Sequence, residues 1–220
     1  MNRFWKLFGQ RRFFWPLLAI PGIWRLVIPA CTDGLGFNPL FELLHRTGQI
    51  AVWLLVAALS LTPFKTLFPR SQLVNALNKH RRAIGVAAFL YAALHVSEHF
   101  VYEGEFQGYF RNLAQPFFLT GTFGIVALLL LAATSNNFSV RRLGYHRWKW
   151  LHRLVYFAAI GLVWHVGTAG KWNWTFARTV FIPLLILQLL RVLKAGFNRS
   201  RTTPPSAPAK LTPTASEVES

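Results

Sequence analysis

The chain has 220 residues, of which 53% are hydrophobic and only 14% are charged. A soluble domain carries about a quarter charged residues, so this composition excludes an ordinary water-soluble protein and favours a membrane-embedded one. The net charge of +17 would suit a nucleic-acid-binding protein, but the distribution of the basic residues accounts for it differently, as described below.

Six apolar stretches are each long enough for a transmembrane helix, which needs about 20 residues to cross a hydrocarbon core of about 30 Å. In chain order they cover residues 13–30, 48–64, 83–101, 116–134, 151–168 and 172–193. Pro16, Pro21 and Arg25 make the first stretch the least regular. Before the second stretch, Asn38 and Pro39 are typical of a helix N-cap and first helical residue, which predicts a short helix over 38–45 on the membrane surface.

These stretches predict an all-α, polytopic membrane protein whose core is a six-helix transmembrane bundle. Residues 1–12 form a basic N-terminal tail, and residues 13–195 form the transmembrane domain. Residues 196–220 are rich in Pro, Ser, Thr and Ala and hold few large apolar residues. Such a segment buries too little surface to offset its ordering entropy, so a disordered tail is expected.

The basic residues gather at alternate ends of the six stretches. The N-terminal tail, the second-to-third and fourth-to-fifth connections and the C-terminal end together hold 19 of the 24 Lys and Arg residues. Five of the seven acidic residues lie near the other side. Because cytoplasmic loops carry an excess of Lys and Arg, both termini are expected in the cytoplasm. The topology of a membrane protein in the lipid bilayer therefore accounts for the net positive charge, and no nucleic-acid partner is expected.

Two histidines, His95 and His165, lie well inside the third and fifth stretches, which run in the same direction. Both fall in the outer half at matched depth. Ionisable residues within a membrane are functional candidates, and two imidazoles at one depth suit axial ligation of a haem iron from both sides. Cys31 is the only cysteine and there is no C-x-x-C-H motif, so a non-covalent haem b is expected. The alternative is a neutral histidine hydrogen-bonded to a neighbouring helix.

At the cytoplasmic edge, Arg81 precedes His95 by fourteen residues and His152 precedes His165 by thirteen. His152 is interpreted as a ligand of a second haem, a flavin contact or an ordinary interfacial histidine. Thirteen residues of helix place His152 and His165 on different faces, so a bend near His152 would be needed to aim both at one neighbour. Arg81 stays protonated, which favours contact with a propionate or phosphate over axial ligation.

The remaining histidines give weaker indications. His99 lies one helical turn after His95 on the same face, where it could replace His95 as a ligand or meet a haem propionate or water. A metal site formed by these two histidines is less favoured, because no matching carboxylate lies deep in the membrane. His45, His80 and His146 fall in predicted loops and are expected to face solvent.

Between residues 34 and 193, several short motifs follow one another at regular places in the predicted helices. They are Gly34–Gly36, Asn38–Pro39, Thr47–Gly48, Leu61–Pro63, Arg81–Arg82 with Gly85, Tyr91–His95, Gln115–Phe117 with Gly121, Leu143–Gly144, Arg147–Trp148, Leu151–Tyr156 and His165. In order and spacing they resemble the haem-binding membrane subunits of bacterial protein-methionine-sulfoxide reductase systems, the MsrQ family, within the ferric-reductase-like transmembrane group.

The resemblance implies a bacterial inner-membrane protein that binds haem b, with FMN as a second cofactor. The family ligands correspond to His95, His152 and His165. The resemblance also implies electrons from the quinone pool or a cytoplasmic flavin reductase, and a periplasmic molybdopterin-containing partner that repairs oxidised methionines. Catalysis at methionine sulfoxide would belong to that partner, so it stays open whether this chain is itself an enzyme.

We expect a one-electron relay that begins at the basic cytoplasmic edge, where Arg81, Arg147 and His152 would contact a flavin phosphate. It would continue through haem between His95 and His165 toward the periplasm. There is no G-x-G-x-x-G motif, so direct hydride transfer from a nicotinamide is not expected. A ferric reductase or respiratory cytochrome b is an alternative function. A transporter or scaffold with structural histidines is an alternative of another class.

Overall fold

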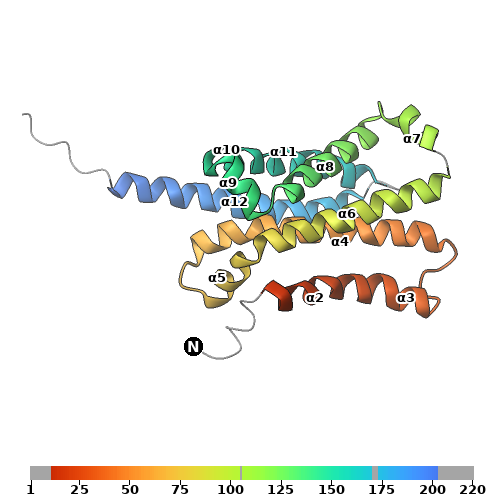
Figure 1. Ribbon diagram of the computed structural model, residues 1–220, viewed down its shortest axis with the longest axis horizontal. Helices are drawn as coiled ribbons and strands as arrows, with labels where there is room; N and C mark the ends of the chain where they lie inside the picture. Colours follow the sequence, from red (N-terminus) through yellow and green to blue (C-terminus); the bar gives the residue numbers. More distant parts are fainter. Residues whose placement is uncertain (1–10, 105, 170–172, 203–220) are drawn as a thin grey trace, which may run out of the picture.

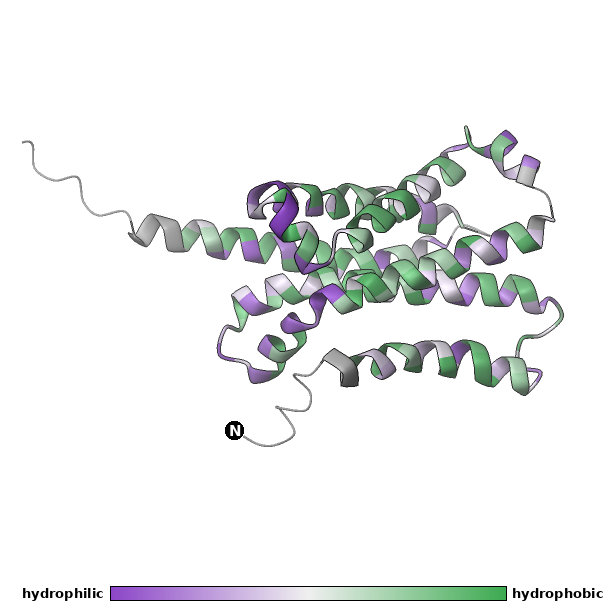
Figure 2. Ribbon diagram, in the orientation of Figure 1, coloured by the Kyte–Doolittle hydropathy of each residue, from purple (hydrophilic) through white to green (hydrophobic). Residues whose placement is uncertain are grey.

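The computed structural model describes residues 11–104, 106–169 and 173–202. Within these residues every regular element is helical, which confirms the all-α prediction. The long helices lie side by side along one direction, and the chain reverses direction from each to the next (Figure 1). Apolar residues fill the middle of the helices, and hydrophilic residues gather toward both ends (Figure 2).

The first transmembrane segment consists of α2 (Arg11–Gly22), a π-helical turn η1 (Ile23–Val27) and α3 (Ile28–Cys31). It packs against α4 and α6 (Arg81–Glu103). The hydroxyl of Tyr91, in α6, accepts from the backbone N–H of Gly22 at 3.0 Å and donates to the carbonyl of Leu18 at 3.2 Å. These two backbone groups would bond each other in a regular α-helix, so Tyr91 is inserted into the helical hydrogen-bond ladder.

Tyr91→Phe should therefore loosen the first segment. The substitution leaves the Gly22 N–H and the Leu18 carbonyl without the hydroxyl that binds both. We expect a loss of about 1–3 kcal/mol of stability, measured as a lower midpoint of thermal unfolding in detergent. Tyr102→Phe, which alters a tyrosine 42% exposed on the same helix, is the control. Equal midpoints for the two variants would contradict this role of Tyr91.

The helix α4 (Pro39–Leu67) begins as predicted but does not end where predicted. The side chain of Asn38 caps it by accepting from the N–H of Phe41 at 3.2 Å. The helix then continues for 29 residues, so the separate surface helix over 38–45 is wrong. An ion pair of Glu42 with Arg46 at 2.7 Å, one turn apart, stabilises the continuous form.

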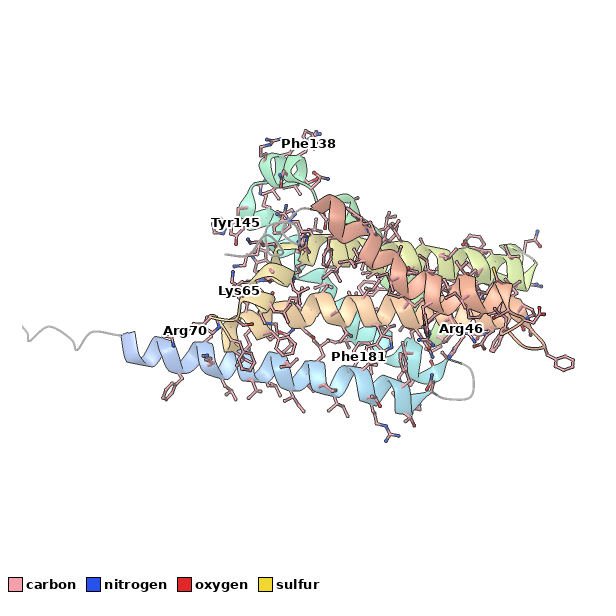
Figure 3. The ribbon with its side chains drawn as sticks, turned by 90° about the horizontal axis from the view of Figure 1, so that it is seen from below. Arg46, Lys65, Arg70, Phe138, Tyr145 and Phe181 are labelled. Carbon is pink, nitrogen blue, oxygen red and sulfur yellow. The ribbon has the colours of Figure 1, made fainter. Side chains whose placement is uncertain are left out.

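In the rest of the chain, short helices at the two ends of the bundle connect the long helices that run along it. These are α5 (Gln72–Lys79), α7 (Phe106–Asn112), α8 (Pro116–Ala133), α9 (Asn137–Leu143), α10 (Tyr145–His152), α11 (Leu154–Thr168) and α12 (Trp174–Thr202). The helices α5, α9 and α10 lie at the end where α2 begins and toward which α12 runs, which we name the basic end (Figure 1). Lys65 and Arg70 lie there, whereas Arg46 lies toward the opposite end (Figure 3).

Five helices of the described chain are long and apolar enough to cross a membrane, which makes this a multi-pass membrane protein. They cover Phe14–Cys31, Pro39–Leu67, Arg81–Tyr102, Pro116–Ala133 and Trp174–Phe197. The predicted fifth crossing is the 15-residue α11, which at 1.5 Å per residue spans only about 22 Å. The six-span arrangement therefore stays a prediction. Residues 196–202 are helical in α12 rather than part of a disordered tail, and residues 203–220 lie outside the described chain.

Candidate functional site

A cavity of about 170 Å³ lies among α4, α6, α8, α11 and the start of α12. Its lining is mostly apolar and includes Val52, Leu55 and Leu128. The two histidines singled out from the sequence, His95 on α6 and His165 on α11, both line it. A largely apolar cavity with a few convergent polar groups is the usual form of a cofactor site.

The imidazoles of His95 and His165 lie close together where they line the cavity. Their ring centres are 6.3 Å apart and their planes are nearly perpendicular, at 88°. The structure thus brings together the two histidines that were expected at one depth. Two imidazoles that bind one metal through Nε2, with bonds of about 2 Å each, have ring centres about 6 Å apart. The observed separation fits a single metal centre between them.

The hydrogen bonds of the two rings leave the same nitrogen available on each. Nδ1 of His95 donates to the backbone carbonyl of Leu44 at 2.8 Å, and Nδ1 of His165 donates to that of Phe117 at 3.0 Å. Because a carbonyl can only accept, both protons lie on Nδ1, and both Nε2 lone pairs are free in the neutral rings. Donation from the other ring nitrogen to a carbonyl is the usual arrangement in metal-binding histidines.

Two glycines make room for these rings. A Cβ atom at Gly48 would lie 3.0 Å from Nδ1 of His95, and one at Gly121 would lie 2.7 Å from Cε1 of His165. The ring of Phe117 also stacks on His165, with centres 4.4 Å apart. The motif residues Gly48 and Gly121 thus act through their missing side chains, a role that sequence reasoning had not assigned to them.

This donor set fits the axial ligands of a haem. Within the described residues, no three His, Cys, Asp or Glu side chains gather to hold a metal ion. Two imidazoles alone would bind a bare metal poorly, but they complete the coordination of an iron that already has four porphyrin nitrogens. His95 and His165, with ring centres 6.3 Å apart, would provide such a pair of imidazoles.

Other polar groups lie around the cavity. His99 lines it one turn beyond His95, and its buried Nε2 has no hydrogen-bond partner within the described chain. Glu98 accepts from the hydroxyl of Thr47 at 2.6 Å. His45 also lines the cavity, so the expectation that it faces solvent is wrong. The reason is the continuous α4, which places residue 45 inside the bundle rather than in a loop.

His152 and Arg81 lie apart from this cavity, toward the basic end. Nδ1 of His152 donates to the carbonyl of Trp148 at 3.1 Å, and the two rings are 4.0 Å apart. The helix breaks at Arg153, between α10 and α11, near the place where a bend was expected if both histidines were to face one neighbour. Burial lowers the pKa of His152 below its usual value, and the nearby charges of Arg81 and Arg82 lower it further.

The arginines around His152 differ in their surroundings. Arg81 donates to the hydroxyl of Thr62 at 2.8 Å. Arg82 donates to the side chain of Asn137 and lies over the ring of Trp148 at 5.0 Å. Arg147 is exposed on α10. Arg81 and Arg82 lie near enough to His152 to affect its pKa, and the predicted flavin phosphate at this edge stays a prediction.

The two loop histidines at this end have opposite environments. His146 is exposed, as expected. His80 is only 2% exposed and stacks on Phe14 with ring centres 4.1 Å apart, so its predicted solvent exposure is wrong. Phe14 belongs to the first segment, which packs over the short connection between α5 and α6 and covers His80.

Comparison with known proteins identifies relatives over most of the chain. Residues 47–163 match the family model described as "Ferric reductase like transmembrane component". A protein of Agrobacterium fabrum is 38% identical over 82% of this chain and 83% of its own length. One of Herminiimonas arsenicoxydans is 35% identical over 80% and 82%, and one of Brucella ovis is 32% identical over 83% and 80%. All three are named "Protein-methionine-sulfoxide reductase heme-binding subunit MsrQ". No solved structure matches.

Proposed function

This chain belongs to the MsrQ family of haem-binding subunits within the ferric-reductase-like transmembrane proteins, and from this we propose that it is a haem b electron-transfer subunit of the membrane. The single observation that supports it most is the facing pair His95 and His165, with ring centres 6.3 Å apart. Both Nδ1 atoms are held by backbone carbonyls, which leaves both Nε2 atoms free to bind iron.

Bound haem would supply a one-electron carrier whose potential depends on its axial ligands and burial. The residues of this chain would fix its position and exclude water. His95 and His165 would hold the iron from two sides, and Gly48 and Gly121 would keep both rings in the bonding orientation. The apolar lining would keep the site at low dielectric, which favours the less charged state of the iron.

We further propose that the basic end faces the cytoplasm and that the opposite end meets a periplasmic molybdopterin-containing catalytic subunit, which repairs oxidised methionines. The concentration of Lys and Arg in the segments at the basic end supports this inner-membrane orientation. Electrons would come from the quinone pool or from a cytoplasmic flavin reductase. FMN would bind through its phosphate to Arg81 and Arg147, beside His152.

A second candidate function is a ferric reductase, which the description of the matching family model favours. It would use the same helices and the same pair of histidines, and it would differ in the acceptor at the periplasmic end. Identification of the electron acceptor therefore distinguishes the two functions, whereas the haem spectrum would be the same for both.

The test is to purify the chain in detergent and to measure its haem content, its absorption spectrum and the proteins that co-purify with it. We expect about one haem b per chain, a low-spin spectrum that responds to reductant, and a methionine-sulfoxide reductase that co-purifies and is active with electrons from the reduced chain. His146→Ala, which changes the exposed histidine of α10, should behave as the unmodified chain. A folded, colourless protein would contradict the proposal. A haem protein that reduces ferric chelates but no sulfoxide reductase would favour the second function.

A further inference from the structure

Three polar side chains connect the first transmembrane segment to the cavity. Nη2 of Arg25 donates to Oε1 of Gln49 at 2.7 Å, and Nε2 of Gln49 lies 2.9 Å from Nε2 of His45. Gln49 and His45 both line the cavity that holds His95 and His165. Arg25 belongs to the π-helical turn η1, a rare backbone form that occurs frequently at functional sites.

The direction of these hydrogen bonds follows from their chemistry. A guanidinium can only donate, so the oxygen of the Gln49 amide faces Arg25 and its nitrogen faces His45. The amide nitrogen can only donate as well, so Nε2 of His45 accepts, and the ring proton lies on Nδ1. Within the described residues, this Nδ1–H has no hydrogen-bond partner. The chain of bonds thus ends at His45, a residue that lines the cavity, with a donor that has no partner among the described residues.

The charge of Arg25 also lacks a counterpart. Among the described residues, no carboxylate forms an ion pair with it. Glu42 is bound to Arg46 at 2.7 Å, and Arg46 also donates to the backbone carbonyl of Arg25 at 3.0 Å. A cation at membrane depth is costly unless an opposite charge compensates it. An anionic group in the cavity would compensate Arg25 and accept the proton of His45.

We propose that Nδ1 of His45 binds a carboxylate of the cavity ligand, and that Arg25 is a positioning residue that orients Gln49 and attracts this carboxylate. The inference rests on the proposed function, because for a haem held by His95 and His165 the carboxylate is one of the haem propionates. A charge-assisted hydrogen bond of this kind should strengthen binding of the free acid by about tenfold.

The test compares haem with its dimethyl ester, in which the propionates carry no charge. The full chain, purified with its haem, is equilibrated with an excess of the ester, and both porphyrins are then extracted and quantified. The ratio of bound haem to bound ester in each variant is compared with the ratio in the unmodified chain in the same detergent. The partition of the two porphyrins into micelles then affects all samples equally. We expect His45→Ala and Arg25→Gln to lower the preference for the free acid by about tenfold.

Gln49→Glu keeps the shape of the side chain and gives Arg25 its own carboxylate. The fold should be retained, while the preference for the free acid over the ester should fall as much as in the other two variants. Arg178→Gln is the matched control, because it removes a positive charge from α12 without touching the cavity lining. A purely structural role of His45 would weaken binding of both porphyrins and leave the ratio unchanged. An unchanged ratio in all three variants would overturn this inference alone. A wild-type chain that binds neither porphyrin would overturn the proposed function as well.

Discussion

His95→Ala should yield a folded protein that has lost most of its haem. The substitution removes one of the two imidazoles whose centres lie 6.3 Å apart at the cavity, and haem iron with one axial ligand is held far more weakly. We expect the haem-to-protein ratio to fall by at least about tenfold, and any remaining haem to be high-spin. His165→Ala should give the same result, because its ring occupies the equivalent position on the opposite side of the cavity.

Added imidazole should restore a low-spin spectrum to His95→Ala, since it would fill the space of the lost ring. His146→Ala is again the control for removal of a histidine. A low-spin spectrum retained by His95→Ala would contradict ligation by His95. If that spectrum disappeared only when His99 was also replaced, the ligand would be His99, one turn away on the same helix.

Gly121→Ala should displace His165 without removing it. The added Cβ would lie 2.7 Å from Cε1 and 2.9 Å from Nδ1 of the ring, closer than any stable contact, so the ring must move. We expect about a tenfold lower haem occupancy and a shifted reduction potential, because the bond from Nδ1 to the Phe117 carbonyl is strained at the same time.

Gly85→Ala is the matched control for this substitution. A Cβ at Gly85, in α6, meets nothing within 4 Å, so the alanine should leave haem unchanged and stabilise the helix by up to about 1 kcal/mol. Absorption spectra and potentiometric titration of the two variants provide the comparison. Equal haem content and equal potentials would show that Gly121 has no role in placing His165.

The features that depend on local patterns were predictable from the sequence. Apolar runs bounded by charges located the long helices, and the Asn38-Pro39 pair located the start of α4. The depth of His95 and His165 followed from helical geometry, because the rise per residue is constant along each helix.

The features that depend on distant contacts were not predictable. An N-cap pattern predicts where a helix begins but not where it ends. The ion pair of Glu42 with Arg46 stabilises the helix beyond residue 45, and this contact was not predicted. The environment of His45 was therefore predicted wrongly. The burial of His80 depends on Phe14, from a segment far away in the chain. A glycine can occur in an apolar helix for many reasons. Only the distance from an added Cβ atom to an imidazole ring distinguishes Gly121 from Gly85.

The most direct measurement is near-infrared magnetic circular dichroism of the oxidised, purified chain, combined with its electron paramagnetic resonance spectrum. Together they identify the axial ligands of the iron and the angle between their planes. With rings at 88° to each other, we expect the charge-transfer band of bis-imidazole iron and a strongly anisotropic low-spin signal. High-spin iron, or a second ligand that is not imidazole, would contradict the assignment of His95 and His165.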